Sequence, residues 1–262
     1  MRAVVLAAGA GSRLRPLTDE RPKCMVELGG IPLLHRQLSV LASAGITDVT
    51  VVAGACAHAI VAPRANVVLN PHWQSSNMVA SLFHAVEALR ADDVIVVGYG
   101  DIAYERRVLD VLLATDGPLA VVVDRGWRPY WQRRFERPLD DAETLRLRPD
   151  GTIAELGRRP QSIDEIEGQY IGLIKLTRET AADLVEHHYR LVCRDEDGAR
   201  QMYMTEFIQT LIDDGWPVKA AIVEHGWIEI DSPSDVALYE RGALRDVYDD
   251  EEVFVACRQH SC

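Results

Sequence analysis

The sequence predicts an α/β fold in which a doubly wound, mostly parallel, Rossmann-like mixed sheet carries helices on both faces and a small β-rich insertion. Three observations predict it. Short apolar runs at residues 3–8, 49–53 and 94–97 have the length of buried strands. Helix-length amphipathic segments separate these runs, and this alternation is typical of a mainly parallel sheet covered by helices. After Val123 the alternation gives way to a segment rich in Arg, Asp and Pro, which predicts the insertion.

The N-terminal half supplies most of the predicted sheet. Residues 31–44 form the first predicted helix, because Leu34, Leu38 and Leu41 share one face and Gly45 ends it. The other elements predicted in this half are strands at 49–53, 67–69 and 94–97, a short helix at 56–61 and a longer helix at 76–90.

The C-terminal half mixes a hairpin with strands and helices. Asp150-Gly151 has the residue types of a hairpin turn. Ser232 and Asp235 have the spacing of a capping box that begins the last helix. The remaining predicted elements are strands at 170–176, 218–223 and 227–230 and helices at 177–191 and 203–214. We expect the last dozen residues to be loosely held.

Composition argues against several classes of protein. The formal net charge of −12 over 262 residues argues against nucleic-acid and anionic-membrane partners, which favour basic surfaces. No apolar run approaches the roughly 18–20 residues of a membrane span, and the N-terminal apolar run is too short for a secretory signal. The five cysteines are scattered without a CxxC pair, so neither a zinc site nor a disulfide framework is predicted. We expect a cytoplasmic protein.

The first strand runs into a glycine-rich loop that is followed by cations. Gly9 and Gly11 end the strand, and Arg13, Arg15 and Lys23 follow within a dozen residues. Glycines let backbone N–H groups approach a phosphate, and the next helix start adds partial positive charge. Neither GxxxxGK[ST] nor a complete GxGxxG is present, because leucine stands at the third glycine position. The loop therefore predicts a nucleoside triphosphate site of another kind.

The N-terminal run LAAGxGSRLRPLTxxxPKxxxxLGGxPLL resembles the nucleotidyltransferases that couple a phosphorylated small molecule to a nucleoside triphosphate and release pyrophosphate. The resemblance covers about the first 45 residues nearly without gaps and continues more loosely to the final helix. It implies that Arg13 contacts the phosphates and that Lys23 reaches the reacting phosphate. It also implies a nucleotide-binding set made of Leu6, Ala8, Gly9, Gly11, Ser12, Arg13 and Gly100.

Phosphorus chemistry explains these residue types. An acceptor phosphate or phosphonate oxygen attacks the α-phosphorus of the triphosphate, and it is already largely ionised because its second pKa is about 6. No general base is needed. The obstacle is the repulsion between two anions and the charge that builds on pyrophosphate, which fixed cations and a metal ion relieve. Arg13 and Lys23 supply cations, whereas Arg15 is either a third one or part of a surface ion pair.

Two aspartates follow strands at the edge where a doubly wound sheet places its ligands. Asp101 comes directly after VIVVGYG, and Asp231 directly after WIEI. Carboxylates are among the oxygen ligands that Mg²⁺ prefers, and the resemblance implies the same pair of metal aspartates. The alternative is that each is a turn or N-cap aspartate. Glu229 alternates with Asp231 along a strand, so it is either a ligand or partner of this site or an exposed strand position.

The segment after the third strand bears on the choice of nucleotide. Its run N-x-x-[WY]-x-x-[ST]-N-[MN]-x-x-S-L, from Asn70 to Leu82, resembles the branch that uses CTP with phosphocholine or small phosphonates. The GLAQA-like element of hexose-1-phosphate thymidylyl- and uridylyltransferases is absent from this sequence. Asn77 and Ser81 lie four residues apart on one helical face. They are predicted to bind the nucleotide base or ribose, and helix capping is the alternative.

Residues 124–137 interleave arginines with aromatic side chains. A choline headgroup calls for aromatic faces with acidic support, whereas a basic segment better suits an acceptor with extra negative charge, such as a phosphonocarboxylate. The alternatives for this segment are a solvated surface or a contact in a homodimer. For Gly172 the resemblance suggests close backbone approach to the acceptor, and a strand bulge is the alternative. The predicted acceptor-binding residues are Arg125, Arg128, Tyr130 and Gly172.

Together these residues predict a Mg²⁺-dependent cytidylyltransferase that transfers CMP from CTP to a small phosphonate or phosphocholine-like acceptor. A sugar-1-phosphate nucleotidyltransferase is the alternative enzyme, and a silent nucleotide-binding regulatory subunit is the alternative of another class. A silent relative would be free to lose a catalytic residue, so an active enzyme is favoured by the complete set Arg13, Lys23, Asp101 and Asp231. We expect one domain, 1–262, with a nucleotide-binding core at 1–123, an acceptor-side part at 124–231 and a C-terminal helix and tail at 232–262.

Overall fold

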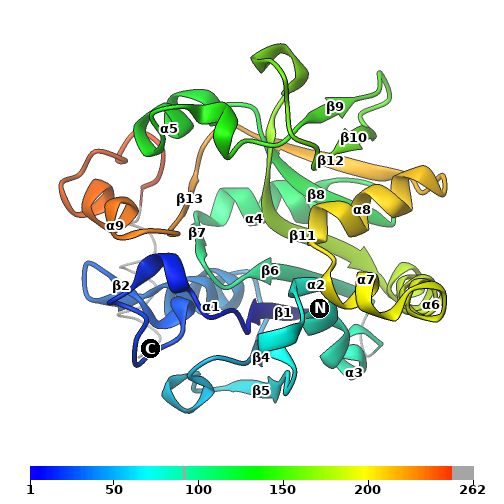
Figure 1. Ribbon diagram of the computed structural model, residues 1–262, viewed down its shortest axis with the longest axis horizontal. Coiled ribbons are helices and arrows are strands. Elements are labelled where there is room, and N and C mark those ends of the chain that lie inside the picture. The colour runs from blue at the N-terminus through cyan, green and yellow to red at the C-terminus, as the bar shows by residue number, and fades with distance from the viewer. Residues whose placement is uncertain (91–92, 250–262) are drawn as a thin grey trace.

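A seven-stranded mixed sheet forms the centre of the computed structural model, which describes residues 1–90 and 93–249. Its strands are β1 (Arg2–Ala7), β4 (Asp48–Ala53), β5 (Ala65–Leu69), β6 (Val94–Tyr99), β8 (Leu119–Asp124), β11 (Gln169–Thr177) and β12 (Val218–Val223). They lie in the order β12-β8-β11-β6-β1-β4-β5 (Figure 1). All neighbours are parallel except those of β11, which runs antiparallel to β6 and β8. The predicted fold class is confirmed.

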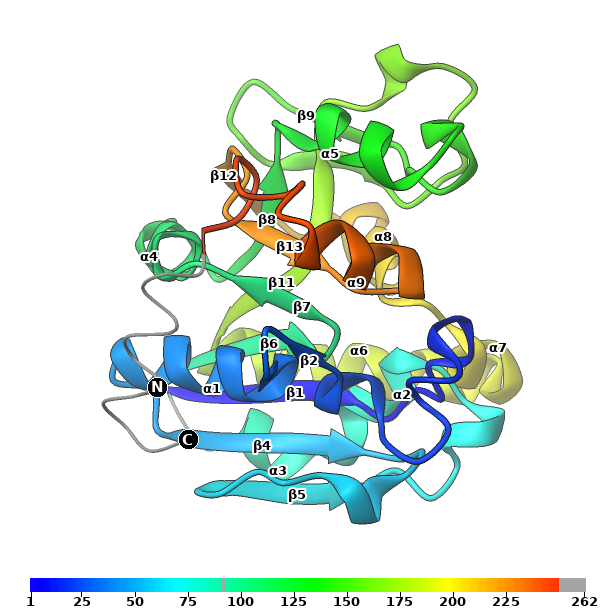
Figure 2. The same ribbon diagram turned by 90° about the vertical axis from the view of Figure 1, so that its left-hand side faces the viewer.

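Helices cover both faces of the sheet because alternate strand residues point to opposite sides. In β1, Val5 packs into the apolar cluster under one face and Val4 into the cluster under the other. The first face carries α1 (Leu33–Ser43), which runs in nearly the same direction as β1 in Figure 2, and α4 (Arg106–Ala114). The second face carries α2 (Met78–His84), α3 (Val86–Leu89), α6 (Arg178–Arg194) and α8 (Met204–Asp213).

A short antiparallel ribbon joins the two halves of the chain beside the sheet. β7 (Ile102–Tyr104) pairs with β13 (Trp227–Glu229). The pairing continues past β13, where the Ile230 N–H donates to the Asp101 carbonyl at 3.0 Å. Ile102, Tyr104, Trp227 and Ile228 are all buried, so apolar packing holds the ribbon in place. The chain after β6 therefore lies beside the chain after β13.

The β-rich insertion stands at one end of the molecule together with α5 (Trp127–Arg134) (Figure 1). It is a hairpin of β9 (Leu145–Leu147) and β10 (Ile153–Leu156). The predicted turn at Asp150-Gly151 is confirmed: Gly151 has a φ of +78°, and Asp150 Oδ1 accepts the Thr152 N–H at 2.9 Å.

The structure also departs from the elements predicted. The helix predicted at 76–90 divides at Ala85 into α2 and α3, and the one predicted at 56–61 is only the 3₁₀ turn Ala57–Ala59. α1 begins at Leu33 rather than residue 31, because β3 (Ile31–Pro32) pairs with β2 (Glu27–Leu28). Two strands, β7 and β8, and three helices have no counterpart in the prediction; the helices are α4, α5 and α7 (Glu196–Gln201).

The chain end is described in part. The predicted capping box is present, with the Ser232 side chain and Asp235 exchanging hydrogen bonds at the start of α9 (Pro233–Glu240). The expectation for the last dozen residues lies outside the described residues.

Candidate active site

A pocket of about 320 Å³ opens where β1 and β6 end. It is formed by these strand ends, the glycine loop, the start of α2 and the segment after β13. All the residues predicted for nucleotide binding, catalysis and metal binding line this one cavity, namely Leu6, Ala8, Gly9, Gly11, Ser12, Arg13, Lys23, Asn77, Ser81, Gly100, Asp101 and Asp231.

Two glycines allow the close approach of backbone segments around the pocket. Gly11 has a φ of +59°, and a Cβ there would lie 3.1 Å from Thr18 Cγ2 and 3.3 Å from Lys23 Cβ. The Thr18 hydroxyl donates to the Gly11 carbonyl at 2.7 Å and closes the loop. At Gly100 a Cβ would lie 2.9 Å from the Leu6 carbonyl oxygen. A side chain at either position would move Lys23 or the strand ends.

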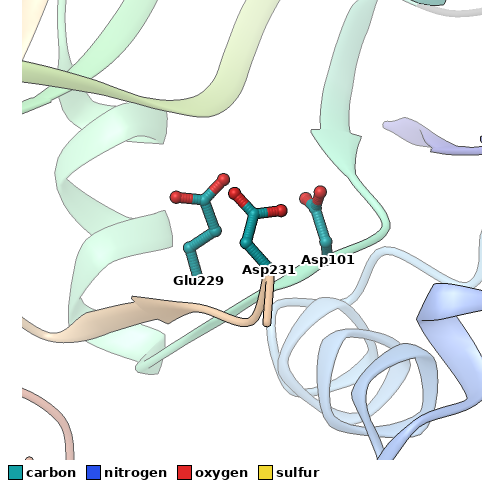
Figure 3. A group of neighbouring side chains, drawn as sticks. All are labelled: Asp101, Glu229 and Asp231. Atoms are coloured by element: carbon teal, nitrogen blue, oxygen red, sulfur yellow. The ribbon is translucent and has the colours of Figure 1, made fainter. Parts of the chain in front are cut away.

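Three carboxylates lie side by side in the pocket: Glu229, Asp231 and Asp101 (Figure 3). One oxygen from each lies within 4.8 Å of the others. The ribbon creates this group, since Asp101 directly precedes β7 and Glu229 ends β13. Asp101 Oδ1 is buried and has no hydrogen-bond partner among the described residues. An unpaired buried oxygen beside two further carboxylates fits a hard divalent cation.

Two cations from the N-terminal segment reach these carboxylates. The Lys23 ammonium donates to Asp101 Oδ2 at 2.7 Å and also to Asp231. Arg13 donates to Asp231 at 3.0 Å, although its side chain remains 68% exposed. Arg15 points elsewhere and forms an exposed ion pair with Asp19 at 3.5 Å. Lys23 is thus held between the carboxylates, whereas the Arg13 side chain has solvent in which to move.

Burial and neighbouring charges shift the pKa values of this group. Burial would lower the pKa of Lys23, but Asp101 and Asp231 outweigh it and raise the pKa above its ordinary value. Burial would raise the pKa of Asp231, yet Lys23 and Arg13 hold it below the usual range. Burial raises the pKa of Glu229 to about 8, against the opposing effect of Arg134. Near neutrality Lys23 is therefore charged and Asp231 is ionised.

Asn77 and Ser81 line the pocket and also serve the local structure. Asn77 is the N-cap of α2, and its Oδ1 accepts the Met78 N–H at 2.9 Å. Ser81 is buried, and its hydroxyl accepts the Asn70 amide at 3.0 Å. Helix capping therefore holds for Asn77, and nucleotide binding stays a prediction for both residues.

Tyr130 is not placed to contact an acceptor, which corrects the expectation from the sequence. The residue is fully buried, and its hydroxyl donates to the Glu229 carbonyl at 3.2 Å and accepts the Glu229 N–H at 2.9 Å. The segment is a helix, so Trp127, Tyr130 and Trp131 share one face and point into the core. These aromatic side chains are core residues and do not line an acceptor site.

The other predicted acceptor residues lie outside the pocket. Arg125 and Arg128 are exposed, neither is among the described residues that line the pocket, and Arg125 borders a separate hollow. Gly172 has a φ of +83° at a register shift of β11, so the strand-bulge alternative holds for it. A Cβ on Gly172 would lie 2.4 Å from Cδ2 of Tyr99, which does line the pocket. Gly172 therefore shapes the wall indirectly.

Further residues line the pocket without having been predicted, among them Cys24, Trp73 and Tyr99. Tyr99 directly precedes Gly100 and Asp101 at a strand end, and Trp73 belongs to the run that resembles the CTP-using branch. These neighbouring motifs are the only signal in the sequence that could have placed the two residues in the pocket. Burial raises the pKa of the Cys24 thiol to about 12, which keeps it protonated and unreactive.

Comparison with known proteins shows the family. The model of the MobA-like NTP transferase domain matches residues 3–147. The CTP:phosphoglutamine cytidylyltransferase of Campylobacter jejuni is 35% identical over 249 residues, which cover 90% of this chain and 98% of that protein. The chain belongs to this nucleotidyltransferase family. The resemblance seen in the N-terminal run is thereby confirmed.

Another relative and a solved structure extend this likeness. The CMP-5'-(3-aminopropyl)phosphonate synthase of Streptomyces rubellomurinus is 28% identical over 253 residues, 90% of this chain and 37% of that protein. The structure of the CTP:phosphocholine cytidylyltransferase from Streptococcus pneumoniae has a TM-score of 0.68 at 20% identity, covering 92% of this chain and 97% of that one. The structural likeness shows the shared nucleotidyltransferase fold. Within residues 1–90 and 93–249, no helix is long and apolar enough to cross a membrane.

Proposed function

We propose that the chain is a Mg²⁺-dependent cytidylyltransferase that transfers CMP from CTP to a small phosphorylated or phosphonate acceptor and releases pyrophosphate. The observation that carries the proposal is the meeting of Arg13 and Lys23 with three carboxylates in a single pocket at the strand ends. The choice of CTP is supported by one relative that is named a CTP-dependent cytidylyltransferase and by another that is named for a product containing CMP.

In the proposed reaction the protein binds, orients and neutralises anions. The glycine loop offers backbone N–H groups to the triphosphate. Arg13 is exposed enough to turn from Asp231 to a phosphate, and Lys23 lies where the reacting phosphate is expected. The acceptor oxygen forms a bond to the α-phosphorus as the bond to the pyrophosphate oxygen breaks, so no covalent enzyme intermediate arises.

Asp101, Glu229 and Asp231 are the residues that would hold the metal ion. Their oxygens suit Mg²⁺, and Asp101 Oδ1 is unpaired among the described residues. When bound, the ion would supply positive charge against the triphosphate and the departing pyrophosphate. Lys23 shares two of these carboxylates, so we expect its ammonium to leave them for the nucleotide when the site is loaded.

The acceptor is the finer part of the proposal. The Campylobacter jejuni relative, which matches along nearly its full length, is named for phosphoglutamine. The Streptomyces rubellomurinus relative is named for an aminopropylphosphonate. The compounds in these two names are small phosphorus acids rather than hexose phosphates. We therefore propose that the acceptor is a small phosphorus acid, and phosphoglutamine is the first compound to test. We also propose that residues 1–123 form the nucleotide-binding core, 124–231 the acceptor side and 232–262 a C-terminal helix and tail.

Pyrophosphate release with Mg²⁺ tests the proposed function. CTP, UTP, dTTP, ATP and GTP are each combined with phosphoglutamine, 3-aminopropylphosphonate, phosphocholine and glucose 1-phosphate. We expect turnover with CTP and one or more of the small acceptors. Turnover confined to glucose 1-phosphate would favour a sugar-1-phosphate nucleotidyltransferase, and no turnover with any pair would favour a regulatory subunit.

A further inference from the structure

Arg134 is a charged side chain that the fold places out of reach of solvent. It lies in the last turn of α5, and its side chain is only 1% exposed. Burying a guanidinium costs several kcal/mol unless acidic partners surround it. Its nearest acidic partners are Glu229, one of the pocket carboxylates, and Asp235, which belongs to the capping box of α9.

The guanidinium group connects these acidic residues directly. Arg134 Nη1 donates to Glu229 Oε2 at 2.9 Å, and Nε donates to Asp235 Oδ1 at 3.0 Å. Nη2 lies 3.8 Å from Asp231 Oδ2. Asp235 in turn accepts the Asp231 N–H at 3.0 Å through its other oxygen, Oδ2. Arg134 therefore fixes the side chain of Glu229 and, through Asp235, the backbone of Asp231.

Aromatic rings from α5 and from the residue that follows it hold the guanidinium in its orientation. Its Cζ lies 5.3 Å from the ring centroid of Tyr130, 5.4 Å from that of Trp131 and 4.9 Å from that of Phe135. Tyr130 also hydrogen-bonds both backbone groups of Glu229. Helix α5 thus controls the position of Glu229 through two side chains, one on its carboxylate and one on its backbone.

From this arrangement we infer that Arg134 is a positioning residue for the metal-binding carboxylates. It touches neither the pocket surface nor the reacting atoms; it keeps Glu229 and Asp231 together and correctly oriented for a divalent cation. The planar fork of arginine is needed because its nitrogens must reach Glu229 and Asp235 at once, which a single ammonium cannot do. The inference rests on the proposed function, since it takes the three carboxylates to be the metal site.

Binding of Mn²⁺ to the full chain, followed by the electron paramagnetic resonance of the free ion, tests this role. Arg134→Met is expected to weaken Mn²⁺ binding by about 10-fold or more. Arg134→Lys is expected to bind Mn²⁺ more tightly than Arg134→Met but more weakly than the wild type. The kcat at limiting metal should fall and recover at high Mn²⁺, because the defect lies in metal affinity. A residue that acted only by its positive charge would give the opposite result, since its removal would tighten cation binding.

The neighbouring arginine supplies a matched control. Arg133 is on the same helix and is also ion-paired, but with Asp246, away from the pocket. Arg133→Met should leave Mn²⁺ affinity unchanged. Unchanged or tighter binding in Arg134→Met would overturn the inference. If that variant does not fold, Arg134→Lys decides, and wild-type affinity in it would likewise overturn the role.

A further variant separates this inference from the proposed function. Asp101→Asn removes a pocket carboxylate without touching Arg134. If Asp101→Asn weakens Mn²⁺ binding and Arg134→Met does not, the metal site stands and the positioning role fails. If Asp101→Asn leaves Mn²⁺ binding at the wild-type level, the metal site itself fails, and the role of Arg134 fails with it.

Discussion

The Lys23 ammonium lies 2.7 Å from Oδ2 of Asp101. The two residues come from different loops, and Gly11 and Gly100 allow those loops to approach. The contact places a charged lysine among three carboxylates, where a divalent cation would also be held. A bound cation would therefore compete with Lys23 for the same oxygens, and this proposed competition leads to the first prediction.

Lys23→Met should have opposite effects on catalysis and on metal binding. We expect kcat for pyrophosphate release to fall about 100-fold or more, because a cation beside the reacting phosphate is lost. Mn²⁺ binding without nucleotide should tighten, because the ammonium no longer pairs with Asp101 and Asp231. Lys219→Met is the control, since Lys219 donates to the Asp150 carbonyl instead and both measurements should stay at the wild-type level. Weaker Mn²⁺ binding in Lys23→Met would contradict the competition.

Asn77 allows the capping and nucleotide roles to be separated. Asn77→Ser keeps an oxygen that can cap α2, so the free energy of unfolding should change by no more than about 0.5 kcal/mol. The amide donor is lost, so the KM for CTP should rise. Asn77→Ala should also raise the KM for CTP and, because the cap is lost, should lower the free energy of unfolding by about 1 kcal/mol. Urea denaturation measures the stability and steady-state kinetics measure the KM. An unchanged KM for CTP in both variants would show that Asn77 only caps α2 and does not bind the nucleotide.

Gly172→Ala should destabilise the protein more than substitution at another left-handed glycine. Gly151 has a similar φ of +78°, but a Cβ added there would meet no described atom within 4 Å, so Gly151→Ala isolates the backbone cost of about 1–2 kcal/mol. At Gly172 the new Cβ would also meet Tyr99, which raises the expected loss to about 2–4 kcal/mol. Urea denaturation of both variants measures the difference. Equal losses would mean that the Tyr99 ring moves aside without cost.

Glu143 predicts a pH dependence of stability. Burial raises its pKa to about 7, well above the ordinary value of a glutamate, despite its hydrogen bond from Thr205. A group whose folded pKa is raised favours the folded state at low pH, and that contribution is lost as pH rises through the folded value. Between pH 5 and pH 8 the free energy of unfolding should fall by about 2 kcal/mol on account of Glu143. In Glu143→Gln this part of the decline should disappear, and an unchanged pH profile would contradict the shift.

The sequence was most informative where chemistry depends on motifs. Gly11, Lys23 and Asp101 stand in recognisable runs at strand ends, and the structure gathers all three in one pocket. Asp231 could be placed because it directly follows a short apolar strand. What the sequence alone did not reveal is that β7 pairs with β13, a contact between distant segments that brings Glu229 to Asp101.

The arginine-rich segment shows why local composition misled. Charge and aromatic content suggested a binding site for the acceptor, but Trp127, Tyr130, Trp131 and Arg134 recur at helical spacing and form a single face. That periodicity would have predicted a helix with a buried aromatic side. The burial of Arg134 was not predictable from the segment itself, because its partners Glu229 and Asp235 lie about a hundred residues further along the chain.

The identity of the product formed from CTP tests the central claim most directly. The chain is incubated with CTP, Mg²⁺ and phosphoglutamine, and the phosphorus species are followed by ³¹P NMR. We predict equal amounts of pyrophosphate and of a compound in which CMP is joined to the acceptor through a new P–O–P linkage. The Asp101→Asn variant should form this CMP-linked product far more slowly. Release of CMP or CDP with the acceptor unchanged would contradict the account, because it would show hydrolysis of the nucleotide instead of transfer.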